Sequence, residues 1–257
     1  MCLILLAHDA HPAHRLVVAA NRDEAYERPT APAAWWEDAP EVLAGRDLRG
    51  GGTWMGITRA GRFAAVTNYR ETAPADPGAP SRGHLVGGFL LGGASPEAYL
   101  RALRPRAADH PGFNLLLGDG ERVWYASNRG DWGRELEPGV YGLSNALLDT
   151  PWPKVERGKS GLRRALEAEG GPDEAELFRL LADAEPAPDD LLPDTGVGTA
   201  LERVLSSPFI ASPGYGTRAS TVLRVGRDDA ADFAERTVAP GAPPSEARFR
   251  FHLAPAR

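Results

Sequence analysis

The chain has 257 residues, of which 42% are hydrophobic and 25% are charged, the composition of an ordinary folded globular protein. Its formal net charge is −6 and its basic residues form no stripe, so we expect no nucleic-acid partner. The single cysteine cannot form an internal disulfide, which favours a reducing compartment. The apolar start is short and lacks a basic leader, and no apolar run reaches membrane-spanning length. These features predict a cytoplasmic protein without a membrane span.

The first elements along the chain form a predicted hairpin. Strands are expected at 3–7 and 15–20, with a turn at 9–14 between them. The second strand is expected to end at Asn21. Antiparallel pairing then places Cys2 close to the polar run 21–24. This geometry makes the first hairpin the predicted location of the functional site.

The rest of the chain alternates hairpins with a central block of helices. Ala60-Gly61 separates two strand-like runs, the second at 62–68, and a surface loop is expected at 71–80. Ser95 and Pro96 are a helix cap and a first helical residue. Helices are predicted over 81–91, 95–104, 153–168, 173–184 and 199–205, and strands over 113–117, 123–127, 139–144, 219–225, 232–238 and 247–253. This order favours antiparallel sheets covered by helices, in one domain that spans 1–257.

Cys2 is the first candidate for chemistry. Aminopeptidases remove Met1 when the second residue is small, which would leave a thiol and a free α-amine on one residue. An α-amine has an unperturbed pKa of about 7.7–8.0, so it can act as a general base near neutral pH. The alternative interpretation is that Cys2 is a small buried residue at the start of a strand.

Four consecutive polar residues, Asn21-Arg22-Asp23-Glu24, follow the second strand. Arg22 could favour the thiolate of Cys2, because nearby cations lower the pKa of a thiol. Asp23 could accept protons from an N-terminal ammonium. The alternative is a turn with a surface ion pair, which contributes at most about 1 kcal/mol.

Three further residues lie near expected strand ends or starts. Asn68 and Asn145 follow predicted strands, where an amide can donate to a developing oxyanion or simply begin a turn. Arg218 follows Gly214-Tyr215-Gly216-Thr217, and such glycines can let an arginine lie close to a ligand or can form an ordinary loop. His8, His11 and His14 are spaced three apart, but a solvated turn is favoured over zinc binding, so we expect no metal.

Taken together, these segments resemble the NRDE family, to which the animal transport and Golgi organisation protein 2 belongs. The resemblance covers most of the chain and is carried by segments that occur in family order: Met1-Cys2, residues 19–24, 50–56, 64–69, 81–83, 113–115, 141–145, Thr150-Pro151-Trp152-Pro153-Lys154 and 214–218.

The resemblance implies a branch of the N-terminal nucleophile hydrolases, with a four-layer αββα fold of two stacked antiparallel sheets (class α+β). Related enzymes, the choloylglycine hydrolases and penicillin V acylases, begin with cysteine after Met removal and hydrolyse amides. They read Arg-Asn-x-Asp where this chain reads Asn-Arg-Asp-Glu, so either Asp23 or Glu24 could meet the amine. By resemblance, Asn68 and Asn145 lie near the oxyanion and Arg218 lies near the nucleophile.

Two functions follow from the resemblance. The first is a cysteine N-terminal nucleophile hydrolase that acts on a linear, non-peptide amide without a cofactor, with Cys2, Arg22, Asp23, Asn68, Asn145 and Arg218 in the site and Asn21 and Glu24 beside it. The alternative is a non-enzymatic protein that binds or transfers haem or an acyl-CoA or other lipid ligand in the same cleft. A pseudoenzyme that keeps only the fold is a third interpretation. Neither the substrate nor the oligomeric state can be derived from the sequence.

Overall fold

Two antiparallel sheets form the centre of the molecule in a computed structural model of the chain, which describes residues 2–73, 76, 78–130, 132–239, 241 and 243–254. The first sheet has the strand order β10-β1-β2-β12-β13-β14, and β11 pairs with β12. Its strands are β10 (Gly139–Leu143), β1 (Cys2–His8), β2 (His14–Ala25), β12 (Tyr215–Gly226), β13 (Ala230–Thr237), β14 (Ser245–His252) and β11 (Ala211–Ser212).

The second sheet follows the chain from one strand to the next, in the order β3 to β9. Its strands are β3 (Thr30–Trp35), β4 (Val42–Asp47), β5 (Met55–Thr58), β6 (Phe63–Asn68), β7 (Phe113–Gly118), β8 (Val123–Ser127) and β9 (Arg134–Glu135).

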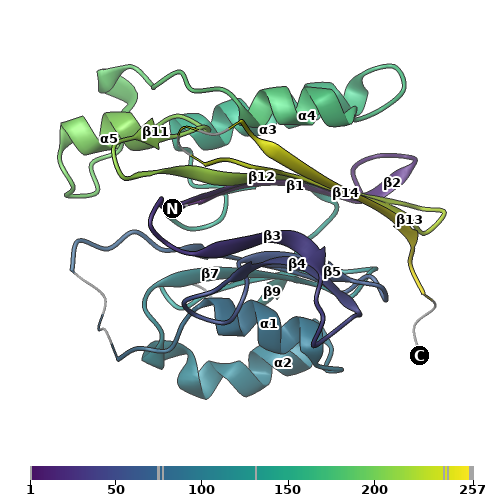
Figure 1. Cartoon of the computed structure of the whole chain (residues 1–257). Helices are drawn as coiled ribbons and strands as arrows, with labels where there is room; N and C mark the ends of the chain where they lie inside the picture. The colour runs from purple at the N-terminus through teal and green to yellow at the C-terminus, as the bar shows by residue number, and fades with distance from the viewer. Residues whose placement is uncertain are drawn as a thin grey trace.

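Helices cover the outer face of each sheet and complete four layers, as the resemblance predicted (Figure 1). The first sheet lies against α3 (Pro153–Glu167), α4 (Glu174–Leu181) and α5 (Thr199–Leu205), and a short 3₁₀ turn (Asp189–Leu191) precedes α5. The second sheet lies against α1 (Gly83–Leu91) and α2 (Pro96–Leu103), which a 3₁₀ helix (Arg104–Asp109) follows. The predicted cap of α2 is confirmed, since the Ser95 side chain accepts a hydrogen bond from the Ala98 N–H at 3.2 Å.

Three apolar cores separate the four layers. Ile4 and Leu6 of β1 belong to the core between the sheets, while Leu3 and Leu5 belong to the core under α3 and α4. A third core joins the second sheet to α1 and α2. Because alternate residues of β1 enter two different cores, both faces of the strand are buried and its sequence is a continuous apolar run.

One feature of the first sheet differs from the prediction, and strand β3 of the second sheet was not predicted. Strand β2 continues through Asn21–Glu24 to Ala25, because β12 pairs with it along this whole stretch. The polar run is therefore inside a strand and is not a turn. The Pro- and Ala-rich stretch 26–40 contains β3, an edge strand whose pairing shifts between Ala31 and Ala34 around Pro32, and proline is tolerated at such an edge.

In the part of the chain that the structure describes, no helix is long and apolar enough to cross a membrane. The predicted surface loop at 71–80 is only partly described, since residues 74, 75 and 77 lie outside the described ranges. Met1, whose removal the hydrolase hypothesis requires, also lies outside them.

Candidate functional site

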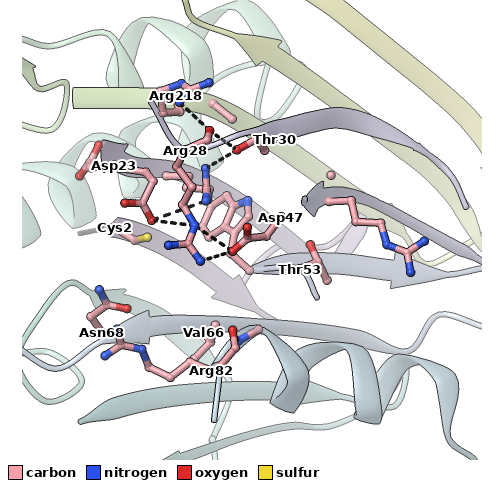
Figure 2. A pocket seen from close by; sticks show the side chains of 18 of the residues that line it. Cys2, Asp23, Arg28, Thr30, Asp47, Thr53, Val66, Asn68, Arg82 and Arg218 are labelled. Atoms are coloured by element: carbon pink, nitrogen blue, oxygen red, sulfur yellow. Dashed lines mark hydrogen bonds and ion pairs between the residues drawn. The ribbon is translucent and has the colours of Figure 1, made fainter. Parts of the chain in front are cut away.

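A cavity of about 350 Å³ opens between the two sheets, and Cys2 lies in its wall (Figure 2). The wall combines residues of β1, β2 and β12 from the first sheet with residues of β4, β6 and the segment before α1 from the second. Its polar lining is rich in guanidinium groups, from Arg22, Arg28, Arg46, Arg82 and Arg218. Segments far apart in the sequence therefore meet at the start of β1.

The predicted pairing of Cys2 with the polar run is confirmed, because Cys2 is directly opposite Arg22 in the β1–β2 ladder. Its side chain is 6% exposed, and its carbonyl accepts a hydrogen bond from the Ser144 hydroxyl at 3.0 Å. Burial raises the pKa of the Cys2 thiol, whereas the charge of Arg22 and the backbone N–H of Asp23 lower it. The thiol is thus held in place at the cavity wall next to a cation.

Arg22 and Glu24 lie on the cavity side of β2. The guanidinium of Arg22 donates to the Thr30 hydroxyl at 3.3 Å, and its Nη2 lies 3.6 Å from a carboxylate oxygen of Glu24. The same Glu24 oxygen is 3.7 Å from Arg28, which also pairs with Asp47 at 2.6 Å. Glu24 therefore neutralises arginines and does not lie free to meet an amine.

Asn21 and Asp23 alternate with Arg22 and Glu24 along β2, so their side chains turn toward the helix side, although Asp23 also contributes to the lining of the cavity. The Thr217 hydroxyl of β12 donates to Asp23 Oδ1 at 2.7 Å. Burial raises the pKa of the Asp23 carboxyl, and the nearby Lys154, Thr217 and Arg22 lower it. Of the two acidic residues that the sequence left open, Asp23 is the one that is fully buried and near the Cys2 backbone.

Asn68 and Asn145, which were both predicted near the oxyanion, lie next to each other, but only Asn68 lines the cavity. Asn68 lines the cavity with Cys2. Asn145 is 1% exposed and does not line it, and its amide donates to the Asn68 carbonyl at 2.9 Å. The Asn145 carbonyl also accepts from the Arg70 N–H at 2.7 Å. Asn145 consequently fixes the backbone that presents Asn68.

Arg218 occupies an irregularity in β12, where the pairing with β2 shifts between Thr217 and Ala219. A bulge of this kind redirects a side chain. Arg218 Nη1 donates to the carbonyls of Ala25, Tyr26 and Arg28, at 3.0, 2.8 and 3.2 Å. The residue lines the cavity, but its main contacts support the turn between β2 and β3.

Sequence reasoning assigned no role to several basic residues of this region, among them Arg82 and Lys154. Arg82 lies across the cavity from Cys2, near Asn68, and donates to the Gly112 carbonyl at 2.9 Å (Figure 2). Lys154, in the first turn of α3, is buried, with 1% of its surface exposed. Both belong to segments that carry the family resemblance, 81–83 and 150–154, which is the one signal that could have identified them.

The first turn does not combine its histidines into a metal site. His11 and His14 approach each other, with their Nδ1 atoms 3.2 Å apart. Among the described residues, no group of three His, Cys, Asp or Glu side chains could hold a metal ion.

The chain matches a family model described as Transport and Golgi organisation 2 over residues 1–240. It is 37% identical over 258 residues to the human Transport and Golgi organization protein 2 homolog, covering 93% of each chain. It is 30% identical over 267 residues to Transport and Golgi organization protein 2 of Drosophila melanogaster, covering 93% of this chain and 92% of that protein.

Solved structures with the same architecture are hydrolases of the N-terminal nucleophile fold. A variant of the conjugated bile acid hydrolase from Clostridium perfringens aligns with a TM-score of 0.52 at 10% identity, covering 100% of this chain and 99% of that one. A Caenorhabditis elegans ortholog of N-acylethanolamine-hydrolyzing acid amidase aligns with a TM-score of 0.50 at 10% identity, covering 86% and 92%. At this identity the likeness concerns the fold alone.

Proposed function

Because the chain belongs to the Transport and Golgi organisation 2 family and has the fold of the N-terminal nucleophile hydrolases, we propose that it hydrolyses linear, non-peptide amides with Cys2 as nucleophile. The observation that carries the proposal is the position of Cys2. Its thiol lies at the start of β1, in the wall of the cavity, opposite Arg22 and beside Asp23. The structural neighbours whose names describe an amidase and a hydrolase support the reaction class.

The first chemical step would join the Cys2 sulfur to the substrate carbonyl carbon. The α-amine of Cys2, free once Met1 is removed, takes the thiol proton and later gives it to the leaving amine as the C–N bond breaks. Water then hydrolyses the thioester and regenerates the thiol. Asp23 holds the amine on the helix side of β1, and Arg22 favours the thiolate.

Asn68 is the side chain that we assign to the oxyanion, because it lines the cavity together with the nucleophile. Asn145 and Arg218 act one step further away, through the Asn68 backbone and the β2–β3 turn. A single oxyanion donor typically contributes about 2.7–4 kcal/mol to transition-state stabilisation. Asn68→Ala is accordingly expected to lower kcat far more than it changes KM.

The test begins with the intact mass of the purified protein, since a retained Met1 would block the α-amine and overturn the mechanism. A panel of acyl-amides is then incubated with the wild type and with Cys2→Ala. The wild type should release amine and form a thioester adduct on Cys2, the only cysteine of the chain. Equal rates from the two proteins would reject the hydrolase. A Soret shift on haem titration in an inactive wild type would instead favour the ligand-binding alternative.

A further inference from the structure

Lys154 is a buried cation that the proposed reaction does not yet use. It follows Pro153, the first residue of α3, and its side chain is 1% exposed. Its Nζ has no hydrogen-bond partner among the residues that the structure describes. A buried ammonium without hydrogen bonds is costly unless a nearby charge compensates for it. The position therefore calls for a carboxylate within electrostatic reach.

The β1–β2 register places the Asp23 carboxyl on the side of the first sheet that α3 covers. Leu3 is directly opposite Asn21, so their side chains and that of Asp23 face the helix side of the first sheet. Leu3 packs in the same core as Val155, the residue after Lys154. Asp23 on the helix side of β2 and Lys154 on the helix that covers this side are thus both buried behind β1, while the Cys2 thiol lies in the wall of the cavity.

The other charged groups around Asp23 and Lys154 mostly form ion pairs with one another. Arg70 and Glu202 form their own buried ion pair, at 2.5 Å. Burial lowers the pKa of Lys154 to about 8, and the charge of the Asp23 carboxylate is the largest influence that opposes this fall. The charged or titratable groups that interact electrostatically with Asp23 or Lys154 are Cys2 of β1, Arg22 of β2, Arg70 after β6, Glu202 of α5 and Tyr215 of β12.

We propose that Lys154 is a positioning residue that shares the Asp23 carboxylate with the Cys2 α-amine and thereby keeps the amine neutral at physiological pH. The inference rests on the proposed function of Cys2. A buried carboxylate with one cationic neighbour would hold that neighbour as an ammonium. An ammonium cannot take the thiol proton. A second cation on the same carboxylate weakens the hold on the first, so the amine is available as a base while Asp23 stays ionised and oriented.

The first test is the pH profile of kcat/KM for the wild type, Lys154→Met and Lys154→Arg. Removing one buried unit charge should move the acid limb of the Lys154→Met profile upward by roughly one to two pH units. Activity at pH 7 should then fall roughly 10- to 100-fold and recover at about pH 9. Lys154→Arg keeps the charge and should keep the wild-type limb. The inference would be overturned if the acid limb of the Lys154→Met profile stayed at the wild-type pH, or if kcat/KM fell by the same factor at every pH.

Lys159 provides a matched control, because it is the only other lysine of the chain and lies on the same helix. It is 8% exposed and pairs with Asp149 at 2.8 Å. Lys159→Met removes the same charge from the same helix without touching Asp23, so its acid limb should match the wild type. A limb that moved equally in Lys159→Met would show a general charge effect and reject the specific role of Lys154.

A second measurement needs no substrate and separates this inference from the proposed reaction. Cys2 is the only cysteine, so labelling with ¹³C-cysteine marks a single residue. After the thiol is blocked with iodoacetamide, the α-amine is the only ionisable group left on Cys2, so its titration dominates the ¹³C shifts of this residue. The midpoint should be higher in Lys154→Met than in the wild type and in Lys154→Arg. Equal midpoints overturn the role of Lys154, whereas a shifted midpoint in a protein that cleaves no amide rejects only the hydrolase.

Discussion

Asn21 is the residue of the polar run that we expect to hold the fold and not to take part in chemistry. Its side chain is 0% exposed. Its amide donates to the carbonyl of Leu181 at 2.8 Å and to that of Pro208 at 2.9 Å, and its oxygen accepts from the Ser220 hydroxyl at 2.6 Å. Leu181 is the last residue of α4, and its carbonyl has no partner within the helix. The Asn21 side chain therefore joins the first sheet to two segments of the helical layer that covers it.

The expected cost of Asn21→Ala follows from these three contacts. A buried hydrogen bond contributes a net 0.5–1.5 kcal/mol, roughly, and a buried group left unsatisfied costs about 1–3 kcal/mol. The Ser220 hydroxyl can rotate to another acceptor, but the two carbonyls cannot move without their helix and turn. We expect a loss of about 3–4 kcal/mol in the free energy of unfolding. For a chain of this size that corresponds to a fall of about 10 °C in Tm.

Urea denaturation followed by circular dichroism measures this loss. Ser220→Ala removes only one of the three bonds and should cost about 1 kcal/mol. Ser160→Ala, on the exposed face of α3, is the matched control and should leave stability within about 0.5 kcal/mol of the wild type. If Asn21→Ala loses less than Ser220→Ala, the bridging role of Asn21 is wrong.

Three further outcomes are expected. Arg22→Gln removes the cation opposite Cys2, so the pKa of the Cys2 thiol should rise. Alkylation of this thiol by iodoacetamide at pH 7.5 should then slow by roughly 3- to 10-fold, because the thiolate is the reactive form. An unchanged alkylation rate would exclude this effect of Arg22. Glu202→Ala leaves Arg70 without its buried partner and should cost about 3–5 kcal/mol in urea denaturation, most of which Arg70→Met should restore in the double variant. Lys154→Met should raise stability at pH 7 by up to about 3 kcal/mol, because a folded-state pKa of about 8, below the unfolded value of 10.5, makes the lysine unfavourable below pH 8. That gain should vanish as the pH rises to 10.5, and a gain that is the same in thermal melts at every pH would contradict it.

The local sequence pattern was sufficient to predict the first hairpin and the helix that begins at Pro96. Strand β1 is a continuous apolar run, and Ser95-Pro96 is a strong start signal, so both could be predicted from short windows of sequence. Strand β3 could not be predicted in this way. Its Pro- and Ala-rich sequence has a weak intrinsic strand propensity, and it becomes a strand because β4 offers it a partner at the edge of the sheet.

The candidate site, too, could be predicted only in part from the sequence. Cys2, Arg22 and Asp23 are brought together by one hairpin, so antiparallel pairing alone predicted their proximity. Asn68 and Asn145 are 77 residues apart, and only the structure shows that one lines the cavity while the other holds its backbone. Asn68 ends β6 and Asn145 follows the end of β10 by two residues, and the sequence contains nothing that distinguishes a donor facing a cavity from one used inside the protein.

By itself, the sequence determined the nucleophile candidate, the family and the layered α+β architecture, because these depend on residue identity, strand pairing within a hairpin and motifs in a fixed order. The tertiary structure decided which side of β2 each residue of the polar run occupies. Strand alternation points the Arg22 side chain to the cavity side of β2 and the Asp23 side chain to the side that α3 covers, where Lys154 is also buried. The burial that makes Lys154 significant is a property of packed layers, so it appears only when the helix lies on the sheet.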